Sequence, residues 1–250
     1  MISCAAEFGV WRSPVAHLLW EQGVGGSNPL TPTISLSGCM LMPMRRIVMF
    51  NWLTTDGYFA GPDGSLDWIV PDQEQAKTAA AGIPGFDKVL FGRVTYKVFE
   101  GFWRGAVEDS STAPDPHRPG ERSQEHRAIA IWLNEATKLV FSRTLKDVTW
   151  KNSRVLHELD PHQIGAMKNQ PGKDMMIFGS GSIVSQLTKH GLIDEYQFTV
   201  CPILIGKGQS LLTGVSKHVR LDLLEAKTLS SGDVMLRYAQ PNQIARETAA

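Results

Sequence analysis

The sequence predicts an α/β protein with a mostly parallel central sheet and antiparallel strands near its C-terminal end. Between residues 45 and 191, strand-like apolar runs alternate with helix-like segments. This alternation is typical of β-α-β units in a parallel sheet. After residue 195, three strand-like segments follow one another with no helix-length segment between them, which indicates antiparallel additions at the sheet edge.

Each element follows from a local pattern. Buried-type apolar runs predict strands at 45–53, 88–92, 138–142 and 174–179, and the closing strands at 195–206, 219–229 and 233–240. Helices are predicted at 72–82, 93–102, 124–137, 161–172 and 181–191. Residues 54–65 contain three glycines and a proline and predict a loop or hairpin, and residues 105–123 form a polar insertion broken by prolines.

These elements predict one domain over residues 44–241, followed by a frayed tail at 242–250. Residues 1–43 have no sustained period and are rich in Gly, Pro, Ser and Thr. One hypothesis is that residues 1–43 are translated from an upstream transfer RNA gene because the start codon is misplaced. The peptide Gly26–Pro29 is what a DNA sequence resembling the T-arm of such a gene encodes. The native start is then Met44, Met42 or Met40. The alternative is an ordinary disordered extension.

The composition excludes several classes of function. Lys+Arg and Asp+Glu are both 25, so the net charge of zero gives no general nucleic-acid-binding surface. No run approaches the roughly 20 apolar residues of a membrane helix. The three cysteines, Cys4, Cys39 and Cys201, form no metal-ligand cluster. Such a sparse, odd set predicts a reducing compartment, the cytoplasm.

Small and basic residues follow three of the predicted strands. Gly92-Arg93 follows the second, Ser142-Arg143 the third, and Gly179–Ser182 the fourth. Ligands of open parallel sheets gather at the carboxyl ends of strands. Glycine lets backbone N–H groups approach a phosphate, and the next helix start favours its negative charge. Together the three ends predict one anion site, although each taken singly is also typical of an ordinary turn.

The ordered set of motifs resembles a known superfamily. The segments "TTDGYFAGPDGSLDW", "KVLFGRVTY", "KLVFSRTL", "MMIFGSGSIVSQLTKHGLIDE" and "CPILIGKGQSLL" occur in that order. They resemble the dihydrofolate reductase superfamily, and within it the branch related to the reductase domain of bacterial riboflavin biosynthesis. The resemblance covers about residues 44 to 240 and implies a three-layer dihydrofolate-reductase-like fold.

The resemblance also implies NADPH as the cofactor. The Gly-Arg-x-Thr turn that contacts the cofactor phosphates maps to Gly92, Arg93 and Thr95. The strand end near the adenosine 2′-phosphate maps to Ser142 and Arg143. The turn around the pyrophosphate maps to these residues: Gly179, Ser180, Gly181 and Ser182, with Ile183 following.

Two acids are candidates for catalysis. The resemblance places the segment around Asp56 on the nicotinamide and substrate side, and Asp72 is the nearest match to the acid that assists protonation in dihydrofolate reductases. Both residues also have structural readings, because Asp56 suits a turn and Asp72 suits a helix N-cap. Lys207, in the loop after the first closing strand, is either a contact for an anionic substrate or a solvated lysine.

The predicted function is that of an NADPH-dependent reductase of a pterin- or pyrimidine-like small molecule. The zinc-deaminase signature that accompanies bifunctional riboflavin enzymes is absent from the sequence. The alternative is an NADP-binding sensor or interaction module without turnover. The resemblance further implies a homodimer that pairs through edge strands.

Overall fold

The computed structural model describes residues 44–70, 72–107 and 124–241. The predicted extension at 1–43, the tail at 242–250 and residues 108–123 of the insertion lie outside the described residues.

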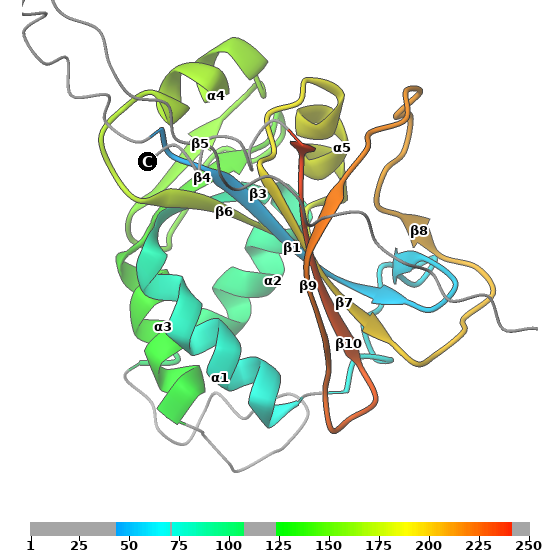
Figure 1. The fold of residues 1–250 in the computed structure, drawn as a ribbon. Helices are drawn as coiled ribbons and strands as arrows, with labels where there is room; N and C mark the ends of the chain where they lie inside the picture. Colours follow the sequence, from blue (N-terminus) through cyan, green and yellow to red (C-terminus); the bar gives the residue numbers. More distant parts are fainter. Residues whose placement is uncertain (1–43, 71, 108–123, 242–250) are drawn as a thin grey trace, which may run out of the picture. The chain divides into compact units, whose positions relative to one another are not determined.

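A mixed sheet of eight strands forms the centre of the domain, in the order β5-β4-β3-β6-β1-β7-β10-β9 (Figure 1). Its strands are β1 (Ile47–Thr54), β3 (Phe86–Gly92), β4 (Thr137–Phe141), β5 (Ser153–Leu156), β6 (Asp174–Phe178), β7 (Glu195–Cys201), β9 (Asp222–Thr228) and β10 (Val234–Ala239). The strands from β5 to β7 run parallel, whereas β10 pairs antiparallel with β7 and β9. The predicted mostly parallel sheet with antiparallel C-terminal strands is confirmed.

Two details of the sheet differ from the sequence prediction. The first closing strand, β7, is parallel to β1, so the antiparallel pairings of this sheet are those of β10 with β7 and with β9. The helix that precedes β7 serves as its crossover connection. A short ribbon also forms where a loop or hairpin was expected, because β2 (Tyr58–Ala60) pairs with the distant β8 (Gln209–Ser210).

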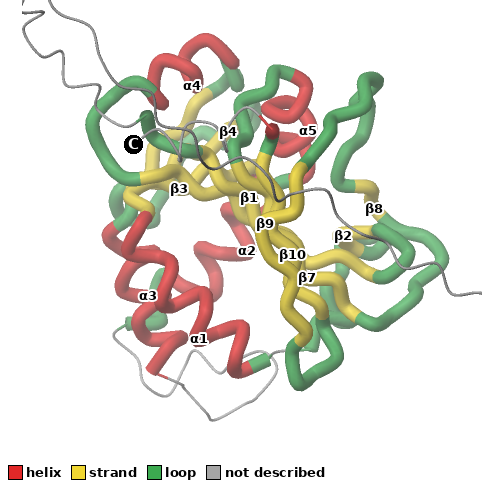
Figure 2. The backbone as a smooth tube through the Cα atoms, in the orientation of Figure 1, coloured by secondary structure: helices red, strands yellow, loops and turns green. Residues whose placement is uncertain are grey.

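Helices cover both faces of the sheet, which completes the three layers (Figures 1 and 2). On one face lie α1 (Gln73–Gly82), α2 (Arg93–Trp103) and α3 (Gln124–Glu135), with a 3₁₀ turn at Ile83–Gly85 after α1. On the other face lie α4 (Pro161–Lys168) and α5 (Gly181–Lys189). Each layer buries its own apolar cluster: Ile47, Met49 and Ile177 pack with α4 and α5, whereas Val89, Phe91 and Val140 pack with α2 and α3.

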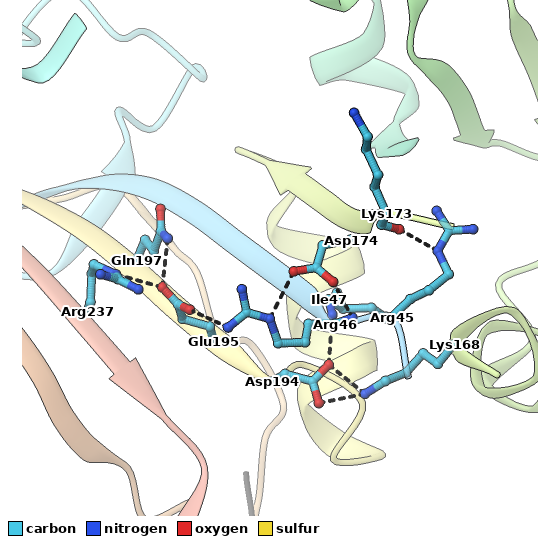
Figure 3. Close-up of polar contacts among 10 residues, drawn as sticks. All are labelled: Arg45, Arg46, Ile47, Lys168, Lys173, Asp174, Asp194, Glu195, Gln197 and Arg237. Atoms are coloured by element: carbon cyan, nitrogen blue, oxygen red, sulfur yellow. Dashed lines mark hydrogen bonds and ion pairs between the residues drawn. The ribbon is translucent and has the colours of Figure 1, made fainter. Parts of the chain in front are cut away.

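The amino ends of the central strands are joined by ion pairs (Figure 3). Lys168 of α4 donates to both carboxylate oxygens of Asp194, at 2.7 and 2.5 Å, and Asp194 also accepts the N–H of Ile47 at 2.7 Å. Glu195 on β7 is held between Arg46 and Arg237. These contacts fix β1 between β6 and β7 at the end of the sheet where the parallel strands begin. The carboxyl ends of these strands lie at the opposite end of the sheet.

Candidate functional site

The three strand ends singled out in the sequence are neighbours in the structure. The strands β4, β3 and β6 are adjacent and parallel, so their carboxyl ends meet at one edge of the sheet. Gly92 at the end of β3 pairs with Phe141 at the end of β4, directly before Ser142. The predicted convergence of these segments therefore occurs.

A direct contact joins the two glycine turns. The N–H of Gly92 donates to the hydroxyl of Ser180 at 2.9 Å, and this hydroxyl donates to the carbonyl of Phe178 at 3.0 Å. Ser180 is buried, so its hydroxyl holds the turn after β3 against the turn after β6. Ser180 thus acts within the protein as the link between the two turns.

The two helices that begin at these turns have no side-chain cap. Gly92, which has no side-chain acceptor, precedes α2. Ser180 precedes α5, and its hydroxyl accepts no N–H group from the first turn of this helix. In contrast, Asp72 caps α1 and Asp160 caps α4. In α5, the N–H groups of Gly181 and Ile183 already donate to the carbonyls of Gly179 and Ser180. The remaining first-turn N–H groups and the positive ends of the two helices favour an anion at this place.

Steric constraints explain why glycine occupies positions 179 and 181. Gly179 has φ = +57°, a left-handed conformation that strains other residues, and a Cβ there would lie 3.4 Å from Thr95 Cγ2. A Cβ at Gly181 would lie 2.8 Å from Phe59 Cζ, so the ring of Phe59 packs directly on this glycine. The side chain of Ile183 is in the core and its N–H donates to the Ser180 carbonyl, which anchors the first turn of α5.

The basic residues of the site face solvent. Arg93 and Arg143 are exposed, and neither makes an ion pair with the described residues. Ser142 is buried, and its hydroxyl accepts the N–H groups of Thr144 and Leu145 at 3.2 and 2.9 Å. This turn places Arg143 two residues after Phe141, the partner of Gly92. The guanidinium groups of Arg93 and Arg143, which form no ion pair among the described residues, add positive charge at this end of the sheet.

Asp56 ties two loops together. Its carboxylate accepts the hydroxyl of Thr54 at 2.6 Å and the N–H groups of Ile205 and Gly206 at 3.2 and 2.7 Å. The Thr54 hydrogen bond, supported by these N–H groups, lowers the pKa of Asp56. The carboxylate is therefore ionised and committed to loop structure, as the turn interpretation expects. The nearby Lys207 is exposed.

Asp72 caps α1 at the same edge of the sheet. Its Oδ1 accepts from Glu74 and Gln75 at 2.8 and 3.0 Å, and its Oδ2 accepts the N–H of Ser231 at 3.2 Å. Burial alone raises the pKa of Asp72, but these hydrogen bonds outweigh it and the pKa is lowered. The N-cap prediction is confirmed, and a catalytic role for Asp56 or Asp72 stays a prediction.

The comparison with protein families places the chain. The sequence model of the RibD C-terminal domain matches residues 45–235, most of the described domain. The chain belongs to the RibD C-terminal domain family. Among curated proteins, YyaP of Bacillus subtilis (strain 168), whose own function is uncharacterized, is 26% identical over 203 residues, covering 79% of this chain and 96% of YyaP.

Solved structures show the same fold. One is from Shewanella sp. PV-4 and carries a provisional name as a riboflavin biosynthesis protein. It matches at TM-score 0.58 and 20% identity, covering 78% of this chain and 98% of its own. Dihydrofolate reductase from Enterococcus faecalis, solved with NADP(H) and an inhibitor named RAB-propyl, matches at TM-score 0.50 and 13% identity, covering 78% and 96%. The RibD C-terminal domain here therefore has the dihydrofolate-reductase-like fold.

An aromatic wall beside the strand ends of this RibD C-terminal domain was not anticipated from the sequence. Phe178 stacks on Phe99 at 5.4 Å between centroids, and Phe50 meets Trp52 edge-on at 4.8 Å. All four rings are only partly buried. Their spacing in the sequence is that of ordinary core residues, so only the pairing of β1 with β6 reveals the wall. Phe50 also meets Phe178 edge-on at 6.3 Å, so the four rings form one aromatic cluster.

Other kinds of site find little support within residues 44–70, 72–107 and 124–241. No group of three or more His, Cys, Asp or Glu residues is placed to hold a metal ion. No helix in these ranges combines the length and apolarity that a membrane crossing requires. Burial raises the pKa of the Cys201 thiol to about 12, so this cysteine stays protonated and does not serve as a nucleophile.

Proposed function

We propose that this RibD C-terminal domain is an NADPH-dependent reductase of a pterin- or pyrimidine-like small molecule. The observation that carries the proposal is the Gly92–Ser180 hydrogen bond, which sets two glycine turns side by side in front of two uncapped helices. The N–H groups of Gly92, Gly179 and Gly181 donate within the protein. The positive ends of α2 and α5, with their remaining N–H groups, suit the paired phosphates of a dinucleotide. Gly179 and Gly181 let Thr95 and Phe59 pack against the second turn, where a Cβ would crowd them.

In this proposal, the residues of the chain bind and orient the cofactor. The turns at Gly92 and Gly179–Ser182 hold the pyrophosphate, and the exposed Arg93 and Arg143 neutralise the 2′-phosphate side. The partly buried Phe50, Trp52, Phe99 and Phe178 supply apolar ring surface against which a heterocycle packs. NADPH, when bound, supplies the hydride.

Cofactor binding is tested by titrating the full chain with NADPH and NADH while following tryptophan fluorescence. We expect NADPH to bind more tightly, and Arg93→Ala and Arg143→Ala each to weaken NADPH binding about tenfold. Arg220→Ala, an exposed loop arginine, is the matched control and leaves the affinity unchanged. Equal affinity for both nucleotides, with no effect of the two arginine variants, refutes the proposal.

The second candidate is an NADP-binding module without turnover. It is favoured by one observation: both candidate acids, Asp56 and Asp72, are held by backbone N–H groups at lowered pKa and are not poised to donate a proton. Loss of NADPH absorbance with dihydrofolate or a ribosylaminopyrimidine distinguishes the two. Consumption supports the reductase, and tight binding without consumption of NADPH supports the module.

The proposal includes a homodimer in the cytoplasm. The outer edge of β9 is the end of the sheet, and Leu223 and Leu224 on this strand are 56% and 39% exposed. An exposed apolar edge strand invites pairing with another strand. Sedimentation of the full chain tests this part: a dimer that dissociates on Leu223→Lys substitution agrees with it, and a monomer contradicts it.

A further inference from the structure

The hairpin between β9 and β10 touches the start of α1 (Figure 1). The hydroxyl of Ser230 and the N–H of Ser231, both in this hairpin, donate to Oδ2 of Asp72 at 3.3 and 3.2 Å. Asp72 is also the N-cap of α1, and its Oδ1 accepts the N–H of Gln75 at 3.0 Å. One carboxylate therefore holds both the first turn of α1 and the turn of the hairpin.

A second carboxyl, that of Asp233, lies close to this contact. Asp233 directly precedes β10 and is only 2% exposed. The buried thiol of Cys201 on β7 donates to its carboxyl, whereas its Oδ2 has no hydrogen-bond partner among the described residues. Lys227 of β9 is close enough to sense the charge of Asp72, but its ammonium is paired with Glu74 at 2.6 Å. A buried carboxylate with an unpaired oxygen is unfavourable, so its surroundings favour the protonated form of Asp233.

The two carboxyls differ in how tightly they hold a proton. Burial raises the pKa of Asp72, but hydrogen bonds from Gln75 and Ser231 outweigh it, and the pKa is lowered. Burial also raises the pKa of Asp233, and the charge of Asp72 adds to this effect. Hydrogen bonds from Cys201 and Ser231 do not offset it, so the pKa of Asp233 stays raised. Neighbouring acids whose pKa values are pushed apart in this way hold one proton between them.

The hydroxyl of Ser231 is shared by the two carboxyls. It interacts with the side chains of Asp72 and Asp233, and its oxygen accepts the N–H of Asp233 at 3.4 Å. A serine hydroxyl carries a single proton, so it cannot donate to two carboxylates at once. Both interactions are satisfied when Asp233 keeps a proton and Ser231 donates to Asp72. When Asp233 is ionised, two negative charges face one hydroxyl proton and repel each other.

We propose that one proton, held by Asp233 and Ser231 beside the ionised Asp72, latches the β9–β10 hairpin onto α1, and that loss of this proton loosens the contact. Capping of α1 by Asp72 needs no second carboxyl. The buried Asp233 is therefore what distinguishes this latch from an ordinary N-cap.

The latch acts on the aromatic cluster through Gln75. The side chain of Gln75 accepts the indole N–H of Trp52 at 3.3 Å and donates to the hydroxyl of Thr199 at 2.6 Å. Because Gln75 belongs to the turn that Asp72 caps, a change at the latch reaches the ring of Trp52, and Asp233 is a positioning residue for this ring. Contact of Trp52 with a heterocycle rests on the proposed function, whereas the latch itself does not.

Carbon-13 NMR of the full chain, labelled at the aspartate carboxyls and titrated from acid to neutral pH without NADPH, tests the latch. We expect Asp233 to titrate above the ordinary aspartate value of about 3.9. In Asp72→Asn its midpoint should move to lower pH, because the neighbouring charge is gone. The matched control, Asp147→Asn, removes an exposed aspartate between β4 and β5 and leaves the midpoint of Asp233 unchanged.

The indole N–H resonance of Trp52, assigned from the spectrum of Trp52→Phe, reports the positioning role. It should shift with the same midpoint as Asp233 in the unmodified chain and lose this shift in Asp233→Asn. Ser231→Ala, which removes the shared hydroxyl, should also separate the Trp52 shift from Asp233, and it serves if Asp72→Asn does not fold.

Three results overturn the proposal. They are an ordinary midpoint for Asp233, equal midpoints in the Asp72→Asn and Asp147→Asn variants, and a Trp52 resonance that does not follow Asp233. No measurement here uses NADPH or a substrate, so the latch can fail while the proposed function holds, and the reverse.

Discussion

Gly179 is the residue of the glycine turn at which a side chain is least tolerated. Its left-handed φ of +57° and the nearby Thr95 methyl leave little freedom for a side chain. Gly179→Ala should lower the free energy of unfolding by about 1–2 kcal/mol and weaken NADPH binding. Thermal denaturation and NADPH titration measure the two effects.

Gly82 supplies the control for this substitution. It ends α1 with φ = −82°, and a Cβ there meets nothing within 4 Å. Gly82→Ala should therefore leave NADPH affinity unchanged and stability equal or slightly higher. If both alanine variants behave alike, the turn at Gly179 has no special steric role.

Asp72 is both an observed N-cap and a proposed acid, and one substitution separates the roles. Asparagine caps helices about as well as aspartate, so Asp72→Asn should change the free energy of unfolding by less than about 1 kcal/mol. A catalytic acid at this position predicts a large fall in turnover with NADPH affinity kept. Unchanged turnover in a steady-state assay, at unchanged stability, leaves Asp72 with the capping role alone.

At the scale of elements, the Lys168–Asp194 pair joins α4, β7 and β1. The two side chains are 8% and 3% exposed, and Asp194 also accepts the Ile47 N–H. Asp194→Ala leaves a buried ammonium and an unpaired N–H, so we expect a loss of about 3–5 kcal/mol. Urea denaturation measures this loss.

The exposed pair Lys151–Glu135 gives the contrast. Its side chains are 57% and 68% exposed, so Glu135→Ala should cost less than about 1 kcal/mol. If Asp194→Ala and Glu135→Ala lower the free energy of unfolding by similar amounts, burial does not determine how much these ion pairs stabilise the fold.

The sequence was informative where local chemistry decides an element. The strands before Gly92 and Gly179 and the cap at Asp72 were predicted because apolar runs, glycines and an N-cap aspartate act locally. The ribbon β2–β8 was missed because it pairs residues about 150 positions apart through two short segments. The strand β5, with only four residues and an exposed Arg154, carries too little pattern to detect.

The same limit applies to the site. The strand ends were recognisable from the Gly, Ser and Arg residues that follow them. Their convergence could then be predicted, because the carboxyl ends of parallel strands lie at the same end of a sheet. The link through Ser180, the packing of Phe59 on Gly181 and the contact of Ser231 with Asp72 depend on which loops meet in space. No local spacing encodes these contacts.

At the scale of the whole molecule, the amino and carboxyl ends of the parallel strands differ in how their charges are compensated. At the amino edge, Asp194 and Glu195 are neutralised by Lys168, Arg46 and Arg237. At the carboxyl edge, the exposed Arg93 and Arg143 are left without ion pairs among the described residues. Positive charge is thus compensated where the strands begin and available where they end, which suits an anionic ligand at the carboxyl edge.

This charge arrangement predicts how stability depends on pH. Burial opposes ionisation of Glu195, but Arg237 and Gln197 outweigh it, and the pKa of Glu195 is lowered. The pKa of Glu100 is lowered in the same way, against burial, by Thr149, Lys97 and Tyr96. Carboxyls with lowered pKa bind protons more readily in the unfolded chain, so they stabilise the fold above the ordinary pKa of about 4 and lose that contribution as pH falls below it.

We therefore expect the urea midpoint of the full chain to stay level from neutral pH to about 5 and to fall as the pH approaches about 3. Glu195→Gln should lower the midpoint at neutral pH and flatten part of the fall, because the neutral side chain no longer gains from ionisation beside Arg237. Glu158→Gln, an exposed residue with no ion pair among the described residues, should leave the curve unchanged. A Glu195→Gln curve that is parallel to that of the unmodified chain shows that this ion-pair cluster does not govern acid stability, and the fall must then come from other carboxyls with lowered pKa.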